Sequence, residues 1–282
     1  MDAMTIPVSC EFFPPRTDKG MEKLKQIHDK LKQALNPEYF SVTFGAGGST
    51  QEKTFETVNH IQQAGSEAAP HLSCIASTKD NIRELLQNYK DSGISRIVAL
   101  RGDKPSGWLG SIGEFSYANE LVTFIREETG DHFHLEVAAY PEFHPQSKSA
   151  ATEFKYFQQK VEAGANAAIT QYFYNVDSYF QFMDECQKRG IDIPVVPGIM
   201  PISNFEQLVR FSDTCGADIP RWLRWKLDGF QDDGDSLQEF AADFIAQMCE
   251  RLIQGGAPSL HFYTLNKANL TLNIARNIGL TQ

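Results

Sequence analysis

Short apolar runs alternate with amphipathic segments along the whole chain, and this alternation restricts the possible folds more than any other feature. The apolar runs have the length of buried strands, and they are Val8–Phe13, Tyr39–Phe44, Ala68–Ile75, Arg96–Leu100, Leu135–Tyr140, Ala167–Gln171, Pro194–Gly198 and Leu260–Tyr263. Segments with helical spacing lie between and after them: Met21–Leu35, Thr50–Gln63, Asn81–Ser92, Tyr117–Glu128, Ala150–Ala163, Val176–Arg189, Phe205–Cys215, Leu237–Ile253 and Ala268–Ile278. The pattern predicts a parallel sheet whose strands are connected by helices.

The number of strand–helix units leaves two α/β architectures open. Dividing the 282 residues by eight strands gives about 35 residues for each unit, close to what a (β/α)8 TIM barrel needs. An open, doubly wound sheet of eight strands has the same alternation, so the count does not separate the two.

Helix ends are marked by capping residues. Asn204 precedes Phe205-Glu206-Gln207, an order typical of a helix N-terminus. Glycines stand just beyond several helical segments, where a left-handed residue commonly ends a helix, and these are Gly65, Gly93, Gly130, Gly164 and Gly190.

We expect a single domain over residues 1–282, because the chain contains no Pro/Gly/Ser-rich linker, repeat or low-complexity tract. The irregular segment Asp218–Ser236 is interpreted as an insertion in the seventh loop. We expect Trp222 and Trp225, which lie within it, to belong to the core, and the acidic residues near Asp232 to form a solvated loop.

Composition excludes several classes of protein. With 26 Lys and Arg against 36 Asp and Glu, the net charge of −10 disfavours nucleic-acid binding, which needs a basic face. No apolar run approaches the length of a membrane span, and residues 1–4 lack the basic and apolar regions of a signal peptide. The five cysteines form no CxxC pair, which argues against disulfides and structural zinc and indicates a soluble, cytoplasmic protein.

The first strand ends in an unusual carboxylate, Glu11. Alternation along a strand places Glu11 on the same face as Ser9 and Phe13, opposite Cys10 and Phe12. The apolar neighbours are expected to raise the pKa of Glu11, which would suit a general acid. A buried carboxylate held in an ion pair explains the same pattern equally well.

Other strands also end in polar residues. Arg101-Gly102-Asp103 follows the fourth run, Tyr140 and His144 follow the fifth, and Gln171 ends the sixth. A loop salt bridge would explain the arginine and aspartate, and a lone histidine such as His144 is more often structural than a ligand. In a (β/α)8 barrel, however, all these ends share the rim at which active sites lie. We predict no metal site, because the histidines lack a convergent third ligand in the sequence.

The glycine-rich segment Gly45-Ala46-Gly47-Gly48 follows a strand and precedes a helix, as a dinucleotide-binding loop does. The third glycine position is Thr50, and the chain contains no GxxxxGK sequence. The segment therefore fails as a Rossmann signature, although its helix N-terminus could receive an anion.

Several strings near the strand ends carry a family resemblance. They are Glu11–Arg16 (EFFPPR), Ser41–Ala46 (SVTFGA), Ala69–Leu72 (APHL), Ile97–Asp103 (IVALRGD), Ala138–Pro145 (AAYPEFHP), Ala163–Gln171 (AGANAAITQ), Pro197–Phe205 (PGIMPISNF) and His261–Asn266 (HFYTLN). Through them the chain closely resembles the bacterial methylenetetrahydrofolate reductase family over almost its whole length.

The resemblance implies a single-domain (β/α)8 barrel that binds FAD tightly at the carboxyl ends of its strands. It implies a ping-pong reaction in which NADH reduces FAD and methylenetetrahydrofolate then accepts the hydride in the same position, to supply methyl groups for methionine synthesis. NADPH is not excluded as donor. The resemblance also implies a homo-oligomer, and the absence of the regulatory domain of eukaryotic relatives implies no inhibition by adenosylmethionine.

The resemblance also implies residue roles. Glu11 matches the general acid that protonates the bridging ring nitrogen of the folate, and Asp103 matches an aspartate that binds folate and tunes the flavin. Positions that match FAD contacts are Thr43, Phe44, Ala46, His71, Arg101, Gly102, Asp103, Tyr117, Ala118, Tyr140, His144, Glu153 and Lys160. Arg101 and Lys160 match positions that face the diphosphate. Positions that match folate or nicotinamide contacts are Gln171, Gln207, Phe211 and Lys267.

The chain departs from the family pattern at several of these positions. Glu153 stands where an aspartate is usual, and Lys267 where an arginine is usual, which replaces a bidentate donor with a point charge. Ser147, Tyr156 and Gln159 also differ, and no cofactor role is assigned to them.

Two other functions use the same features. One is a pterin-binding barrel that transfers a methyl group without flavin, and the other is a non-catalytic folate- or flavin-binding protein. Bound flavin, visible in an absorption spectrum, would separate them from a reductase.

Overall fold

A computed structural model describes residues 6–44, 48–102, 113–231 and 233–281. Its strands are β1 (Val8–Phe12), β2 (Phe40–Val42), β3 (Ala68–Ser73), β4 (Arg96–Leu100), β5 (His134–Ala139), β6 (Ala167–Thr170), β7 (Val195–Val196), β8 (Gly198–Ile199) and β9 (Leu260–Tyr263). Its helices are α1 (Asp18–Leu35), α2 (Gly48–Gln63), α3 (Lys79–Asp91), α4 (Ala118–Thr129), α5 (Ala150–Glu162), α6 (Val176–Lys188), α7 (Phe205–Cys215), α8 (Arg221–Asp228), α9 (Gly234–Gln254) and α10 (Ala268–Asn277). Each predicted strand and helix is present, with ends that differ by a few residues.

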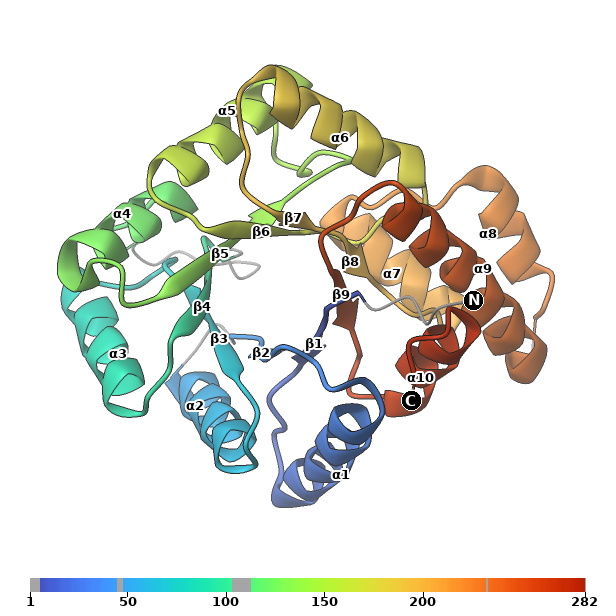
Figure 1. The fold of residues 1–282 in the computed structure, drawn as a ribbon, viewed down its shortest axis with the longest axis horizontal. Helices are drawn as coiled ribbons and strands as arrows, with labels where there is room; N and C mark the ends of the chain where they lie inside the picture. Colours follow the sequence, from blue (N-terminus) through green and yellow to red (C-terminus); the bar gives the residue numbers. More distant parts are fainter. Residues whose placement is uncertain (1–5, 45–47, 103–112, 232, 282) are drawn as a thin grey trace.

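The strands close into a barrel, as Figure 1 shows. Their order is β7-β6-β5-β4-β3-β2-β1-β9-β8, and every described pair is parallel. Only Pro197 separates β7 from β8, and because proline has no N–H to donate, the predicted strand Pro194–Gly198 is divided there. β7 pairs with β6 and β8 pairs with β9, so the two short strands occupy one position in the ring. The (β/α)8 prediction is therefore confirmed, and the open sheet is excluded.

Alternate residues of each strand face two different environments. Cys10 and Phe12 of β1 belong to the large apolar cluster that also contains buried residues of the surrounding helices. Val98 of β4 instead joins Tyr39 in a small cluster, while its neighbours Ile97 and Ala99 join the large one. Helices therefore cover the outside of the barrel, and the inner face is left for the smaller cluster and for polar side chains.

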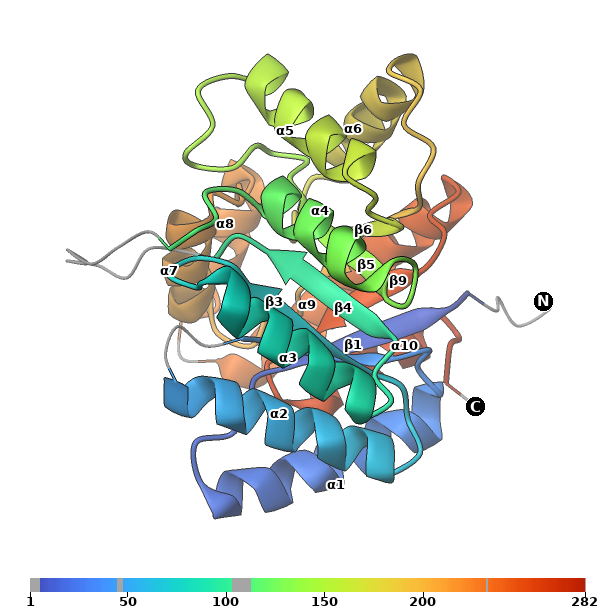
Figure 2. The ribbon, with the colours of Figure 1, turned by 90° about the vertical axis from the view of Figure 1, so that its left-hand side faces the viewer.

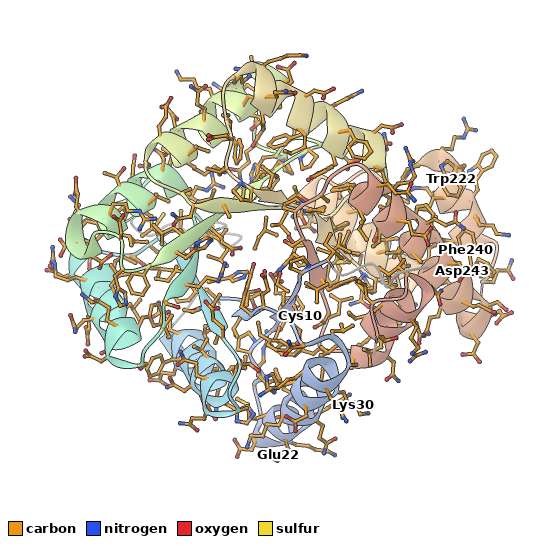
Figure 3. The ribbon with its side chains drawn as sticks, viewed as in Figure 1. Cys10, Glu22, Lys30, Trp222, Phe240 and Asp243 are labelled. Carbon is orange, nitrogen blue, oxygen red and sulfur yellow. The ribbon has the colours of Figure 1, made fainter. Side chains whose placement is uncertain are left out.

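The outer faces of the helices carry charge. Glu22 and Lys30 of α1 are exposed, and in Figure 3 they point away from the barrel, whereas Cys10 of β1 is buried in the layer between the strands and the helices. Leu24 and Leu31 of the same helix are buried, at the spacing that an amphipathic helix requires.

The predicted caps are confirmed where the structure describes them. The Asn204 side chain accepts a hydrogen bond from Gln207 N at the start of α7. The glycines predicted to follow helices all have positive φ angles: Gly65, Gly93, Gly130, Gly164 and Gly190.

Two expectations for the segment Asp218–Ser236 are wrong: it is not only a loop, and its tryptophans do not lie in the core. It contains helix α8, which lies at the edge of the molecule beside α7 and α9 (Figure 1). Trp222 and Trp225 are not core residues, because their exposed fractions are 55% and 65%. Leu223 and Leu227, four residues apart, take the buried face of this helix and leave both tryptophans on the outside. Figure 3 shows Trp222 at the outer edge of the molecule.

All the functional predictions concern one end of the barrel. In Figure 2 the arrowhead of β4 points away from the side on which the N-terminus lies. Because the strands are parallel, their carboxyl ends share this mouth.

Within the described residues, no helix is long and apolar enough to span a membrane.

Candidate active site

Glu11 lies inside the barrel near the carboxyl end of β1 and is only 9% exposed. The parallel register places it beside Ser41 of β2 and Tyr263 of β9. Its Oε2 is 3.3 Å from His71 Nε2 and 3.7 Å from His261 Nε2. The carboxylate is thus held between two imidazoles that come from β3 and β9.

The expected rise of the Glu11 pKa is wrong. Burial raises the pKa, but the charges of His71 and His261 outweigh burial and lower it to about 2. Alternation turns the apolar neighbours Cys10 and Phe12 to the outer face, as predicted, so they do not surround the carboxylate. Of the two explanations considered for Glu11, the structure therefore agrees with a buried carboxylate that is paired with nearby cationic groups.

The loop after β9 holds the end of β1 in place. Thr264 Oγ1 donates to the Glu11 carbonyl at 2.6 Å. Asn266 accepts from Phe13 N and donates to Phe13 O, both at 2.9 Å, and its positive φ of 53° permits this turn. Three hydrogen bonds from this loop therefore fix the backbone at the end of β1.

A cavity of about 410 Å³ opens beside the ends of β4 and β5. Most of the predicted FAD contacts line it, and they are Arg101, Gly102, Tyr117, Ala118, Tyr140, His144, Glu153 and Lys160. The structure also places Ser147 and Tyr156 in its wall, two residues to which the sequence assigned no role. The rings of Tyr117 and Tyr156 stack with centroids 5.6 Å apart, which gives the cavity a flat aromatic edge.

Lys160 brings a buried positive charge into this wall. Its Nζ donates to the Ala138 carbonyl, and burial lowers the pKa of Lys160 to about 8, although Glu153 raises it. Glu153 is also buried, and its Oε2 accepts from Ser147 Oγ and from His144 N. Glu153 therefore holds the loop before α5 in place through hydrogen bonds. Lys160 offers a positive charge to an anion in the cavity.

Gly102 allows the backbone to pass close to β3. Its φ is +84°, and a Cβ built there would lie 1.9 Å from Ser73 Oγ. Arg101, beside it, donates from Nη2 to Gln146 Oε1 at 2.8 Å across the cavity. A side chain at position 102 would displace the strand end on which Arg101 stands.

Three other predicted FAD contacts lie outside the cavity wall. His71 faces Glu11 instead, and Thr43 and Phe44 follow β2, where Thr43 N donates to Phe12 O at 2.9 Å. Ala46 and Asp103 fall outside the described residues, so their roles stay predictions.

The predicted folate contacts come from three elements at the same mouth. Gln171 follows β6, and its Oε1 accepts from Tyr172 N at 3.0 Å. Gln207 and Phe211 lie four residues apart on one face of α7, where Phe211 is exposed. Lys267 is exposed at the start of α10 and donates to Ser203 Oγ at 3.1 Å. These four residues therefore lie at the same mouth of the barrel, and their roles in binding folate stay predictions.

Two residues around Glu11 were missed. His261 is buried, and its Nδ1 is 2.7 Å from Ser9 Oγ. Alternation predicted that Ser9 shares a face with Glu11, but no local signal connects either residue with His261, which is 252 positions from Ser9.

Within the described ranges, no group of three His, Cys, Asp or Glu side chains could hold a metal ion.

Comparisons with known proteins identify close relatives. The family model described as methylenetetrahydrofolate reductase matches residues 1–279. The 5,10-methylenetetrahydrofolate reductase of Escherichia coli strain K12 is 42% identical over 276 residues, which cover 98% of this chain and 91% of the relative. The enzyme of the same name from Pectobacterium carotovorum is also 42% identical over the same shares.

More distant matches agree. Methylenetetrahydrofolate reductase (NADH) 1 of Arabidopsis thaliana is 36% identical, over 96% of this chain and 48% of the plant protein. A solved structure from Clostridium thermocellum, of a protein described as binding two copies of 5-methyl-5,6,7,8-tetrahydrofolic acid, superposes with a TM-score of 0.69. It covers 98% of this chain and 95% of that one at 16% identity, so it bears on the fold alone.

Proposed function

This chain belongs to the methylenetetrahydrofolate reductase family of oxidoreductases, and on that premise we propose that it reduces 5,10-methylenetetrahydrofolate to 5-methyltetrahydrofolate with hydride from NADH, carried by bound FAD in a ping-pong sequence. The observation that carries the proposal is that a large cavity with a buried cation opens at the mouth where Glu11 faces two imidazoles. We also propose that the enzyme is a cytoplasmic homo-oligomer and that its product supplies methyl groups for methionine synthesis.

The residues of the cavity fit FAD. Lys160 and Arg101 offer positive charge to a diphosphate, and Gly102 lets the backbone approach where a Cβ would collide with Ser73. The stacked rings of Tyr117 and Tyr156 offer an apolar surface to a flat ring. FAD, when bound, stores the hydride between the two half-reactions, which no side chain of the protein can do.

Glu11 is proposed as the group that gives a proton to the folate ring nitrogen. Its carboxylate lies between His71 and His261, which lower the pKa of Glu11 to about 2, and the proton that it gives to the substrate leaves from Oε2. Burial excludes water from the transfer, which strengthens every electrostatic interaction in the site. Reduction of the flavin by NADH needs no such proton, so Glu11 should serve the folate half alone.

Four residues are proposed to bind the second substrate. Gln171 offers an amide beside β6, and Phe211 offers an exposed ring on α7, one turn after Gln207. Lys267 is proposed to attract the glutamate tail of the folate as a point charge. Asp103 is proposed to contact both the pterin and the flavin.

The absorption spectrum of the purified protein, with and without added FAD, tests the proposal. We expect a yellow protein whose flavin bands bleach when NADH is added without oxygen and return when methylenetetrahydrofolate follows. A protein that stays colourless after reconstitution with FAD would contradict the proposal and favour a flavin-free barrel. A flavin that NADH bleaches but that methylenetetrahydrofolate does not reoxidise would contradict the choice of acceptor.

A further inference from the structure

Glu142 connects the loop that follows β5 (residues 140–149) with the loop that follows α7 (residues 216–220). Its Oε2 accepts a hydrogen bond from Asp218 N at 2.8 Å, and its Oε1 accepts one from Ser178 Oγ of α6 at 3.4 Å. Asp218 and Ser178 are 76 and 36 positions away from Glu142 in the sequence. One half-buried carboxyl group therefore joins three separate segments of the chain.

The two loops also pack directly against each other. Gly216 has a positive φ of 77°, and a Cβ built there would lie 2.8 Å from Pro145 Cγ. A cavity of only about 10 Å³ remains beside this contact, and its wall contains both Tyr140, a predicted FAD contact, and Gln171, a predicted folate contact. The contact between the loops, which Glu142, Pro145, Gly216 and Asp218 form, is the loop junction.

Helix α7 carries two predicted folate contacts and ends at the loop junction. Gln207, Phe211 and Cys215 are four residues apart, so they lie in one row along the helix. Cys215 lines the small cavity together with Glu142, and its Sγ donates to Tyr172 Oη at 3.3 Å. The loop junction therefore holds the carboxyl-terminal end of the row on which Gln207 and Phe211 lie.

The loop after β5 is also held by a second carboxylate. Glu153 of α5 accepts from His144 N at 3.3 Å and from Ser147 Oγ. A truncation of Glu142 leaves these two hydrogen bonds in place. The loop that lines the cofactor cavity should therefore keep its position, and the loop after α7 should be the part that moves.

We propose that Glu142 is a positioning residue that holds the end of α7 against the loop after β5, and so sets the place of Gln207 and Phe211 relative to the cofactor cavity. Glu142 is not among the described residues of the cavity wall, so it acts through α7 and not by contact with the cofactor. The inference rests on the proposed function, because that function assigns folate binding to Gln207 and Phe211.

The hydrogen bonds of Glu142 do not require its charge. Burial raises the pKa of Glu142 to about 7, although the hydrogen bond from Asp218 N lowers it. A protonated carboxyl still accepts from Asp218 N through one oxygen and donates to Ser178 Oγ through the other. Glutamine has the same shape, with a carbonyl oxygen and an NH2 group for the same two partners. Glu142→Gln should therefore preserve the loop junction, and Glu142→Ala should remove it.

The experiment follows the folate half-reaction without NADH. The flavin is reduced photochemically without oxygen, and its reoxidation is measured at increasing concentrations of methylenetetrahydrofolate. In Glu142→Ala, the concentration that gives half of the limiting rate should rise at least about fivefold, which corresponds to the loss of one hydrogen bond. The limiting rate should change by less than about threefold, because binding is weakened and no reacting group is removed.

Two comparisons separate positioning from a general loss of structure or charge. Glu142→Gln should bind folate within about twofold of the wild type, and FAD affinity should change by less than about twofold in both Glu142 variants. Asp177→Ala is the matched control for charge, because Asp177 precedes Ser178 on α6 but pairs with Arg251 at 2.9 Å. It should leave the folate dependence within about twofold of the wild type.

Hydrogen exchange measures the loop junction itself and needs no folate. In the FAD-loaded protein, Glu142→Ala should speed exchange at the Asp218 amide at least about fivefold, whereas Glu142→Gln should leave it near the wild-type rate. If Glu142→Ala fails to fold, Glu142→Asp keeps the charge but is one methylene shorter, and it should change both measurements in the same direction. An unchanged folate dependence in a folded Glu142→Ala, or an equal loss in Glu142→Gln or Asp177→Ala, would overturn the inference.

Failure of the proposed function has a different result. A wild-type protein whose reduced flavin is not reoxidised by methylenetetrahydrofolate refutes the function. Hydrogen exchange at Asp218 then still decides whether Glu142 holds the end of α7.

Discussion

Lys160 is a buried cation in a protein whose net charge is −10. Burial lowers the pKa of Lys160 to about 8, because its wall of the cavity offers one carbonyl and the Glu153 carboxylate in place of water. A diphosphate beside Lys160 would favour the charged amine, and the binding energy gained in this way depends on the amine being protonated.

FAD affinity should therefore depend on pH. As pH rises through about 8, Lys160 loses its proton in the free protein, so FAD binding should weaken progressively. In Lys160→Met the affinity at pH 7 should fall by about tenfold or more, and this alkaline weakening should disappear. Flavin fluorescence titrations between about pH 6.5 and 9.5, a range that brackets this transition, measure both effects.

Lys155→Met is the matched control, because Lys155 lies on the same helix but is exposed. It should leave the pH dependence intact. An equal loss of affinity in both variants would show that general electrostatics, rather than Lys160, attracts the cofactor.

Gly102 makes a second residue-scale prediction. Gly102→Ala adds a Cβ at 1.9 Å from Ser73 Oγ as well as the strain of a φ of +84°. Gly93→Ala has nearly the same φ, +74°, but nothing within 4 Å. Gly93→Ala should therefore cost about 1 kcal/mol of unfolding free energy, and Gly102→Ala at least about 2 kcal/mol more, with loss of FAD binding. Urea unfolding of both variants measures the difference. Equal losses of unfolding free energy would show that the edge of the cavity accommodates the added methyl group without an energetic penalty.

The residue scale also shows where sequence reasoning stops. Alternation predicted correctly which face of β1 carries Glu11, because strand geometry is local. It gave the wrong direction for the Glu11 pKa, because that pKa depends on His71 and His261, which only the closed barrel brings to the carboxylate. The contact between Glu142 and Asp218 escaped notice for the same reason, since it joins residues 76 positions apart.

At the scale of elements, helix α8 separates its two faces clearly. Leu223 is fully buried, whereas Trp225 is 65% exposed. Leu223→Ala should lower the free energy of unfolding by about 2–5 kcal/mol, because it leaves a cavity in the core. Trp225→Ala should change it by less than about 0.5 kcal/mol in the monomer. Denaturant unfolding measures the free energy of unfolding of both variants. A large loss of stability in Trp225→Ala would show that Trp225 is a core residue after all.

Most elements could be predicted because their signals are local. Helical spacing, the Asn204 cap and the glycines after helices depend on residues within a turn of one another. Helix α8 was missed because its apolar face contains only Leu223 and Leu227, and the tryptophans suggested a different buried face. The division of the predicted strand at Pro197 depends on pairing with both β6 and β9, which follows from closure of the barrel.

At the scale of the whole molecule, closure of the barrel gathers the site. β1, β3 and β9 bring Glu11, His71 and His261 together, and β4 and β5 end at the neighbouring cavity. The regular alternation predicted parallel strands connected by helices but did not separate a barrel from an open sheet, and the barrel was implied by the family resemblance. The cavity and its distances could not be predicted, because they depend on side chains from separate units. One mouth that holds the cavity proposed for FAD beside the proposed proton donor suits the two half-reactions proposed above.

The central claim is that Glu11 serves the folate half-reaction alone, and anaerobic stopped-flow measurement of both half-reactions in Glu11→Gln tests it most directly. Glu22→Gln, on the exposed face of α1, is the control. Glu11→Gln should reduce its flavin with NADH within about twofold of the wild-type rate. Its reoxidation by methylenetetrahydrofolate should fall at least about 100-fold, the usual contribution of a general acid. Equal slowing of both halves, or unchanged reoxidation, would contradict the account.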